Sequence, residues 1–309
     1  MTRIAIVSTA HVHAASYEAV LRRMPAVELR VVERVEELGD WRPDGVVVTS
    51  ENARHRADVE AAAAIGAHVL CEKPLATTEE DAVALVESCR ATGVGLMVAY
   101  PVRFSPEAVR LRELAAAGAL GEIVSAIGVN TGRLPTVPWF SDPARSGGGA
   151  LVDHIVHLAD LLDETLGLRA RSVHAVANRV LHAERAGEGA ETAGLVTIEY
   201  EGGAVATIDC SWSLPDASPS WGGLQLEVVG TAGSIRLDPF ALALTGMDAD
   251  GRATSVGLGP DLDELMLRTF VDAVEGRAPF EPDGEVGLRT LRIVLAALRS
   301  AATGRPVDL

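Results

Sequence analysis

The first 120 residues alternate short apolar runs with amphipathic helical patterns, and this alternation is the strongest constraint on the fold. Runs that stay apolar over four or five positions are typical of strands covered on both faces. Strands separated by helices predict right-handed βαβ units and a parallel sheet. We expect strands at 4–7, 27–32, 44–50, 68–74 and 94–100, and helices at 14–24, 54–65, 78–92 and 105–117. The second crossover, Glu33 to Pro43, is too short for a full helix, so we expect its helix to be cut to about one turn or lost.

After Gly121 the pattern changes to a series of strand-like segments, with a helix at 150–167 and two closing helices near 261–275 and 285–303. The strand-like segments cover 121–132, 171–181, 192–200, 204–214, 224–230 and 233–238. The tripeptide Glu201-Gly202-Gly203 is typical of a hairpin turn. The expected fold is therefore α/β plus α+β. A Rossmann-like domain spans 1–120, and a domain with an open, mostly antiparallel sheet spans 121–309.

Charge and cysteine usage exclude several classes of protein. The net charge of −16 argues against nucleic acid or an anionic membrane surface as a partner, because both need a cationic face. The three cysteines, an odd number without paired spacing, favour reduced thiols. No secretory signal pattern and no apolar run of membrane-spanning length is present. We expect a soluble cytoplasmic protein.

The segment IGAHVLCEKPLATTEEDAVAL (65–85) resembles the Glu-Lys-Pro signature of the Gfo/Idh/MocA oxidoreductases, the glucose–fructose oxidoreductase and inositol dehydrogenase family. Further segments match that family in the same order along nearly the whole chain. They are AYPVRFSP (99–106), GEIVSAIG (121–128), WFSDPARSGGGALVDHIVHLADLL (139–162), LEVVGTAGSIRLD (226–238) and SAATGRPVDL (300–309).

The resemblance implies NAD(P)-dependent hydride transfer to or from a secondary alcohol or ketone of a sugar, cyclitol or related polyol. It makes Lys73 the general acid/base, at a strand end where ligands bind in open α/β sheets. Asp153 and His157, four residues apart on one helix face, would orient the hydroxyls and share the proton work. Substrate contacts are expected from Arg103, Trp139 and His157, and cofactor contacts from Glu72 and Lys73.

The resemblance has two further implications. Gly147-Gly148-Gly149, at the start of the helix that carries Asp153, is expected to let the backbone approach a ligand closely. The second sheet is expected to form a homodimer or homotetramer, because an open sheet leaves an apolar face to be covered.

The first loop departs from the Rossmann pattern. Ser8, Ala10 and His13 stand where a G-x-G-x-x-G fingerprint has its glycines. The helix N-terminus still offers N–H groups and a positive dipole to an anion. We therefore expect pyrophosphate to bind weakly or in an altered pose, with Ser8, Thr9 and His11 as added donors.

Two other strand ends are expected to bind the cofactor. Glu33, about 20 residues after the loop, favours NAD over NADP, although Arg34 beside it points the other way. Ser50, Asn52 and His55 follow the third strand and are also expected to contact the cofactor; Asn52 could instead simply cap the next helix.

Two other functions stay open at this point. The spacing His11-x-His13 also occurs in metal-dependent hydrolases built on (β/α)8 barrels. The later half of this chain has hairpins in place of βα repeats, and the other histidines lack supporting partners, so we expect no metal. Alternatively, the unusual loop could mark a catalytically altered family member, either a ligand-binding protein or an NAD-assisted enzyme whose net reaction is not redox.

Overall fold

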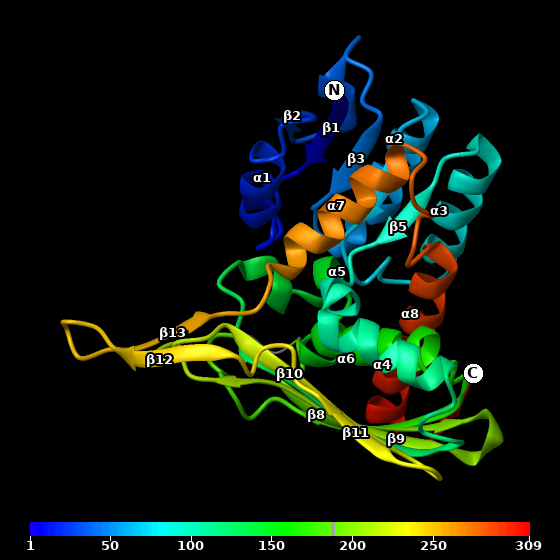
Figure 1. Ribbon diagram of the computed structural model, residues 1–309, viewed down its shortest axis with the longest axis vertical. Coiled ribbons are helices and arrows are strands. Elements are labelled where there is room, and N and C mark those ends of the chain that lie inside the picture. Colours follow the sequence, from blue (N-terminus) through cyan, green and yellow to red (C-terminus); the bar gives the residue numbers. More distant parts are fainter. Residues whose placement is uncertain (187–188) are drawn as a thin grey trace.

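The computed structural model describes residues 1–186 and 189–309, and its chain forms two main sheets with a layer of helices between them (Figure 1). The first sheet is entirely parallel and has the strand order β2-β1-β3-β4-β5. Its strands are β1 (Thr2–Val7), β2 (Val27–Val32), β3 (Gly45–Val48), β4 (His68–Cys71) and β5 (Leu96–Val98). The expected Rossmann-like parallel sheet is confirmed.

Helices cover both faces of the first sheet because its strands are apolar on both sides. Ile4 and Ile6 pack with α1 residues on one face, whereas Ala5 and Val7 belong to the core on the other. The helices of this part of the chain are α1 (Ala14–Arg22), α2 (His55–Ala64) and α3 (Glu79–Thr92), with 3-10 turns η2 (Asn52–Arg54) and η3 (Pro101–Phe104). Helix α4 (Pro106–Ala116) follows η3 but lies against the edge of the second sheet (Figure 1). The shortened crossover after β2 is confirmed as the four-residue 3-10 turn η1 (Val35–Leu38).

The second sheet is mixed, with the order β11-β10-β6-β9-β8-β7-β14. All its pairs are antiparallel except β6 with β9. Its strands are β6 (Ile123–Arg133), β7 (Ala170–Asn178), β8 (Ala193–Tyr200), β9 (Val205–Leu214), β10 (Gly222–Gly230), β11 (Ser234–Leu237) and β14 (Val307–Asp308). The 3-10 turn η6 (Glu201–Gly203) joins β8 to β9, where the sequence predicted a hairpin turn. The expected open, mostly antiparallel sheet is confirmed.

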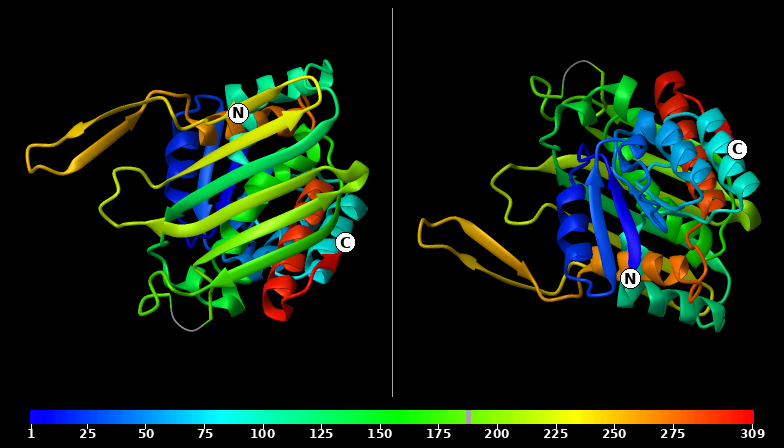
Figure 2. Two further views of the ribbon diagram at one scale, coloured as in Figure 1. Left: turned by 90° about the horizontal axis from the view of Figure 1, so that it is seen from below. Right: turned by 90° about the horizontal axis from the view of Figure 1, so that it is seen from above.

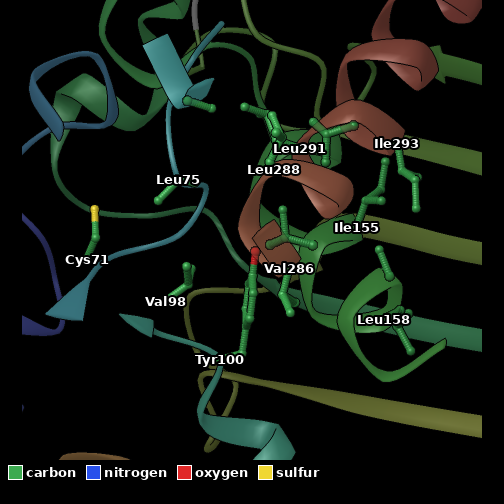
Figure 3. Packing of buried hydrophobic residues seen from close by; sticks show 14 of the residues in the cluster. Cys71, Leu75, Val98, Tyr100, Ile155, Leu158, Val286, Leu288, Leu291 and Ile293 are labelled. Atoms are coloured by element: carbon green, nitrogen blue, oxygen red, sulfur yellow. The ribbon is translucent and has the colours of Figure 1, made fainter. Parts of the chain in front are cut away.

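Helices α6 (Ala150–Asp160) and α8 (Gly284–Thr303) cover one face of the second sheet and join its core to that of the first. In Figure 3 Cys71 and Val98, from the first sheet, share a core with Ile155 of α6 and Leu291 of α8. None of the described helices covers the opposite face of the sheet (Figure 2), and Ile127, Leu195 and other large apolar side chains are exposed. Helix α6 continues into the π-helical turn η5 (Leu161–Thr165). Two short elements, η4 (Pro138–Ser141) and α5 (Pro143–Ser146), come before α6 in the chain.

Two features were not expected from the sequence. Helix α7 (Leu262–Val274) packs on the first sheet, because Leu267 and Phe270 complete the apolar cluster around Ile4 and Ile6. A two-stranded hairpin, β12 (Ala243–Met247) and β13 (Ala253–Gly257), projects beyond the second sheet (Figure 1). Among the described residues, no helix is long and apolar enough to cross a bilayer.

Candidate active site

A cavity of about 900 Å³ lies between the carboxyl ends of the first sheet and the second sheet. The loop after β1 contributes His11 and His13, and the loop after β4 contributes Lys73. Asp153 and His157 line it from α6. The structure therefore brings five of the expected site residues, from three separate segments, around one space.

Lys73 and Asp153 form a buried ion pair at the cavity wall. Lys73 Nζ lies 2.7 Å from Asp153 Oδ1, and the lysine side chain is only 4% exposed. Burial alone would raise the pKa of Asp153, but the charge of Lys73 and nearby donors hold that pKa far below its usual range. The Lys73–Pro74 peptide bond is cis. Lys73 is also the only lysine in the chain, and every other basic residue except histidine is arginine.

Trp212, on β9, is a member of the site that the sequence analysis missed. Its Nε1 donates to Asp153 Oδ2 at 3.0 Å, so both carboxylate oxygens of Asp153 have a partner. The indole is fully buried. The only sequence signal was an aromatic residue at an inward position of an alternating strand, which is more often a core residue.

His157 faces the cavity with an unused ring nitrogen. Its Nδ1 is buried and has no hydrogen-bond partner in the described structure. Burial, assisted by the positive charge of Lys73, lowers the pKa of His157 well below its usual value, so the ring is neutral near pH 7. His154, which was not predicted from the sequence, also lines the cavity. Its buried Nε2 lies 3.7 Å from Asp153 Oδ2 and has no hydrogen-bond partner among the described residues. A neutral imidazole can donate or accept one hydrogen bond from a hydroxyl group.

The glycine run before α6 lets two chain segments approach closely. A Cβ on Gly149 would lie 2.0 Å from the carbonyl oxygen of Glu191, so glycine is needed at this position for close approach to that segment. The Glu191 carboxylate accepts bonds from the N–H groups of Gly149 (2.7 Å) and Leu151 (3.0 Å). These contacts fix the start of the helix that presents Asp153.

The loop after β1 is held by its own side chains. Ser8 has a positive φ of 70°, a conformation that normally favours glycine. Ser8 Oγ accepts from the N–H of Ala10 at 3.3 Å, and His11 Nδ1 accepts from the N–H of His13 at 3.2 Å. The N–H of His11 bonds to the Thr49 carbonyl oxygen. The backbone N–H groups of Ala10 and His13, which a phosphate would use, are therefore bonded to the side chains of Ser8 and His11. Rotation of those side chains would free both groups.

Glu72 lies behind His11 and His13 and does not line the cavity. Its Oε1 is 2.9 Å from His13 Nδ1 and 3.6 Å from His11 Nδ1. Burial would raise the pKa of Glu72, but the two histidines bring it well below its usual value. Burial lowers the pKa of His11 to about 3. Burial would also lower the pKa of His13, but Glu72 outweighs it and raises that pKa above 6.5.

The residues after β3 brace the loops behind the cavity. His55 is fully buried between the carbonyl oxygens of Pro74 (3.0 Å from Nδ1) and Ser50 (3.3 Å from Nε2), so it connects two strand ends. Asn52 Nδ2 donates to the Ser146 carbonyl oxygen at 2.8 Å. The Oγ of Ser50 and the Oδ1 of Asn52 are buried without a partner in the described structure.

Two expected substrate-binding residues lie elsewhere. Arg103 is buried in an ion pair with Asp160, and its guanidinium faces the interior because that carboxylate lies there. Trp139 is also buried and donates through Nε1 to the Ala10 carbonyl oxygen at 3.0 Å. Neither side chain lines the cavity, and Phe140 takes the place at the wall that we expected for Trp139.

The strand ends of the first sheet fit a nicotinamide dinucleotide. The order β2-β1-β3-β4-β5 reverses between β1 and β3, and ligands bind at such a switch point. Partnerless buried oxygens of Ser50 and Asn52 follow β3. At the end of β2, Glu33 is exposed and accepts a bond from Thr9 Oγ1 at 2.9 Å. Such a carboxylate can accept bonds from ribose hydroxyls.

Comparison with known proteins agrees with this geometry. Residues 3–100 match a family model described as an oxidoreductase family with an NAD-binding Rossmann fold, and residues 108–236 match the GFO/IDH/MocA C-terminal domain. The chain is 32% identical to 1,5-anhydro-D-fructose reductase of Ensifer adhaerens, covering 90% of this chain and 84% of that protein. It is 30% identical to D-xylose 1-dehydrogenase (NADP(+)) 2 of Haloferax volcanii, covering 88% of this chain and 82% of that protein.

A solved structure is similar over the same length. The crystal structure of GenD2 from gentamicin A biosynthesis, in complex with NAD, has a TM-score of 0.88 and 27% identity. The match covers 100% of this chain and 96% of that one.

Proposed function

The chain belongs to the Gfo/Idh/MocA oxidoreductase family, and from that premise we propose that it transfers hydride between a nicotinamide dinucleotide and a polyhydroxylated small molecule. The reacting group is a secondary alcohol or the corresponding ketone of a sugar, cyclitol or related polyol. The observation that carries the proposal is the buried Lys73–Asp153 pair at the wall of the cavity, with His157 on the next turn of the same helix.

Lys73 is assigned the proton transfer. During oxidation, a neutral Lys73 amine would take the hydroxyl proton, and a bound nicotinamide dinucleotide would supply the hydride acceptor. During reduction, the Lys73 ammonium returns that proton to the oxygen. Asp153 holds Nζ at the cavity wall and is itself held by Trp212. Since both oxygens of this carboxylate have partners, Asp153 acts mainly by positioning Lys73.

His157 is assigned the second contact with the substrate oxygen. Its buried Nδ1 lacks a partner, and an unpaired buried polar atom at a cavity wall is satisfied when a hydroxyl group binds. His154, from the same turn, supplies a further contact for a neighbouring hydroxyl. A polyhydroxylated substrate offers partners to both rings at once, which is why we favour a sugar or cyclitol over a simple alcohol.

The cofactor is assigned to the carboxyl ends of β1, β2 and β3. Glu33 favours NAD, because its carboxylate can bind ribose hydroxyls and repels a 2′-phosphate. We assign Thr9, Ser50 and Asn52 to the same ligand. We assign cofactor binding to residues 1–120 and substrate binding to residues 121–309, the two regions expected from the sequence. Helix α7 is an exception, since it packs on the first sheet.

We also propose that the uncovered face of the second sheet forms a homo-oligomer. The exposed apolar side chains of Ile127 and Leu195 support this assignment. We further propose a cytoplasmic location. The three cysteines are buried free thiols, which is consistent with a reducing compartment.

Titration of the purified protein with NADH and NADPH, followed by nicotinamide fluorescence, tests the proposal. We expect saturable binding with a preference for NADH. A screen of sugars, cyclitols and aldonic acids, followed by NADH absorbance, then identifies the substrate. A folded protein that binds neither dinucleotide contradicts the proposed function.

A further inference from the structure

The spacing His11-x-His13 lacked a third ligand in the sequence, and the structure supplies one. Glu72, directly after β4, comes up behind the loop that follows β1, and one donor atom from each of the three residues lies within 4.8 Å of the others. We propose that His11, His13 and Glu72 form a binding site for one divalent transition-metal ion of the Zn²⁺ class. This site shares the loop after β1 with the cofactor site proposed above, and it goes beyond the hydride transfer proposed there.

The distances between the donor atoms are those of a metal site before binding. Zinc binds imidazole nitrogen and carboxylate oxygen at about 2.0–2.2 Å, so neighbouring ligands of a tetrahedral ion lie about 3.3–3.6 Å apart. Glu72 Oε1 lies 2.9 Å from His13 Nδ1 and 3.6 Å from His11 Nδ1. The two imidazole rings have centroids 4.6 Å apart and stand at 68° to each other. The Glu72–His11 distance already equals a ligand–ligand distance of this kind, and the Glu72–His13 distance is shorter than one by a few tenths of an ångström. The donor atoms of the two histidines lie within 4.8 Å of each other and would have to close on the ion.

The carboxylate is oriented from behind. Glu72 Oε2 accepts from the Lys73 N–H at 3.1 Å, which turns Oε1 toward the two histidines. Partners that hold a ligand in this way are typical of metal centres. Lys73 forms its ion pair with Asp153, at 2.7 Å, and not with Glu72. The negative charge of Glu72 can therefore interact with a cation.

His11 would bind the ion through Nδ1. His11 is 3% exposed, and its Nδ1 accepts a bond from the His13 N–H, which places the ring hydrogen of the neutral tautomer on Nε2. That Nε2 is buried without any partner in the described structure. Coordination at Nδ1 would exchange one weak hydrogen bond for a bond to the metal.

The donor set selects the kind of ion. Two imidazoles and one carboxylate suit Zn²⁺, Co²⁺ or Fe²⁺ better than Mg²⁺ or Ca²⁺, which prefer oxygen ligands. His13 is partly exposed and lines the cavity, so the remaining coordination position opens toward it. Three protein ligands and one open position are typical of zinc sites that bind an exchangeable oxygen ligand.

The test is titration of chelator-treated, full-length protein with Co²⁺, followed by visible absorption, and then displacement by Zn²⁺. We expect one Co²⁺ per chain, with the intense bands of a tetrahedral site, and complete loss of the bands when Zn²⁺ is added. Glu72→Gln keeps the size of the side chain and removes its charge. It should weaken binding by more than the roughly 10–100-fold that loss of a supporting partner costs.

Two further variants keep the test decisive. His13→Gln replaces a partly exposed ligand, so it tests the site even if Glu72→Gln does not fold. His174→Gln, in an exposed histidine of β7, is the matched control and should bind Co²⁺ like the parent protein. The proposal is overturned if the folded parent protein binds no stoichiometric Co²⁺, or if His13→Gln binds it as tightly as the parent. NADH titration of the same samples reports separately on the proposed function, because dinucleotide binding requires no metal.

Discussion

Lys73 Nζ and Asp153 Oδ1 lie 2.7 Å apart, although the lysine follows a strand of the first sheet and the aspartate belongs to a helix that covers the second. The contact therefore joins the two halves of the molecule at the cavity. Lys73 is the only lysine in the chain, so no other lysine could take its role.

Replacing Lys73 tests the proton transfer. Lys73→Ala should lower turnover by roughly 10²–10⁴-fold, the usual contribution of a general acid or base, while leaving dinucleotide affinity nearly unchanged. Lys73→Arg keeps the charge beside Asp153, but arginine does not release its proton, so this variant should be equally inactive. Steady-state kinetics and NADH fluorescence measure the two effects. Normal turnover in either variant would show that the catalytic assignment is wrong.

Trp212 is expected to act through Asp153. Trp212→Phe removes the donor to Oδ2 and leaves a buried carboxylate oxygen unpaired, so the free energy of unfolding should fall by about 1–3 kcal/mol. Turnover should fall as well, because Asp153 then holds Lys73 less firmly. Denaturant unfolding and kinetics measure both changes. Trp41→Phe also loses an indole hydrogen bond, to the exposed Glu28, but Trp41 does not line the cavity. It is the matched control and should change neither quantity appreciably.

Much of the fold could be predicted from the sequence because its local patterns agree with its packing. The apolar runs of the first sheet, the short second crossover and the Glu201–Gly203 turn all became the elements expected. The packing of α7 on the first sheet could not be predicted, because an apolar helix face does not say which sheet it will cover.

The sequence predicted which segments form the site better than it predicted the contacts between their side chains. Lys73, Asp153 and His157 line one cavity. Arg103 does not, because the decisive partner, Asp160, lies 57 residues away and no local pattern connects the two. Trp212 was missed for the same reason, since its contact with Asp153 spans 59 residues.

Arg103 and Asp160 are expected to stabilise the fold and not to bind substrate. Arg103→Met should lower the free energy of unfolding by about 3–5 kcal/mol, because it removes the guanidinium that pairs with a buried carboxylate. The double variant Arg103→Met/Asp160→Leu should recover most of that loss, since no buried charge of the pair remains. Urea unfolding tests both. A folded Arg103→Met protein of normal stability with a raised KM would instead support the expected role in substrate binding.

Stability should fall in mild acid because several histidines are buried in the neutral form. Burial lowers the pKa values of His157 and His55 in the folded state. The unfolded chain then binds more protons below about pH 6.5, so each such histidine costs up to about 1.4 kcal/mol per pH unit as the pH falls below that value. Unfolding midpoints measured between about pH 7.5 and 5.5 should show the decline. His157→Gln should flatten it, whereas the exposed control His174→Gln should follow the parent protein.

Glu33 is expected to set the preference between NADH and NADPH. It lies exposed at the end of β2, where its carboxylate accepts a bond from Thr9 Oγ1. Two unit charges 4 Å apart in water interact by about 1 kcal/mol, so removing the carboxylate should improve NADPH binding relative to NADH by roughly fivefold. Glu33→Gln tests this through the ratio of the two Kd values, and the effect should shrink as salt is added. Glu37→Gln, in the neighbouring turn η1, removes an exposed charge away from the strand end and should leave the ratio unchanged. An unchanged ratio in Glu33→Gln would mean that Arg34, or another residue, determines the preference.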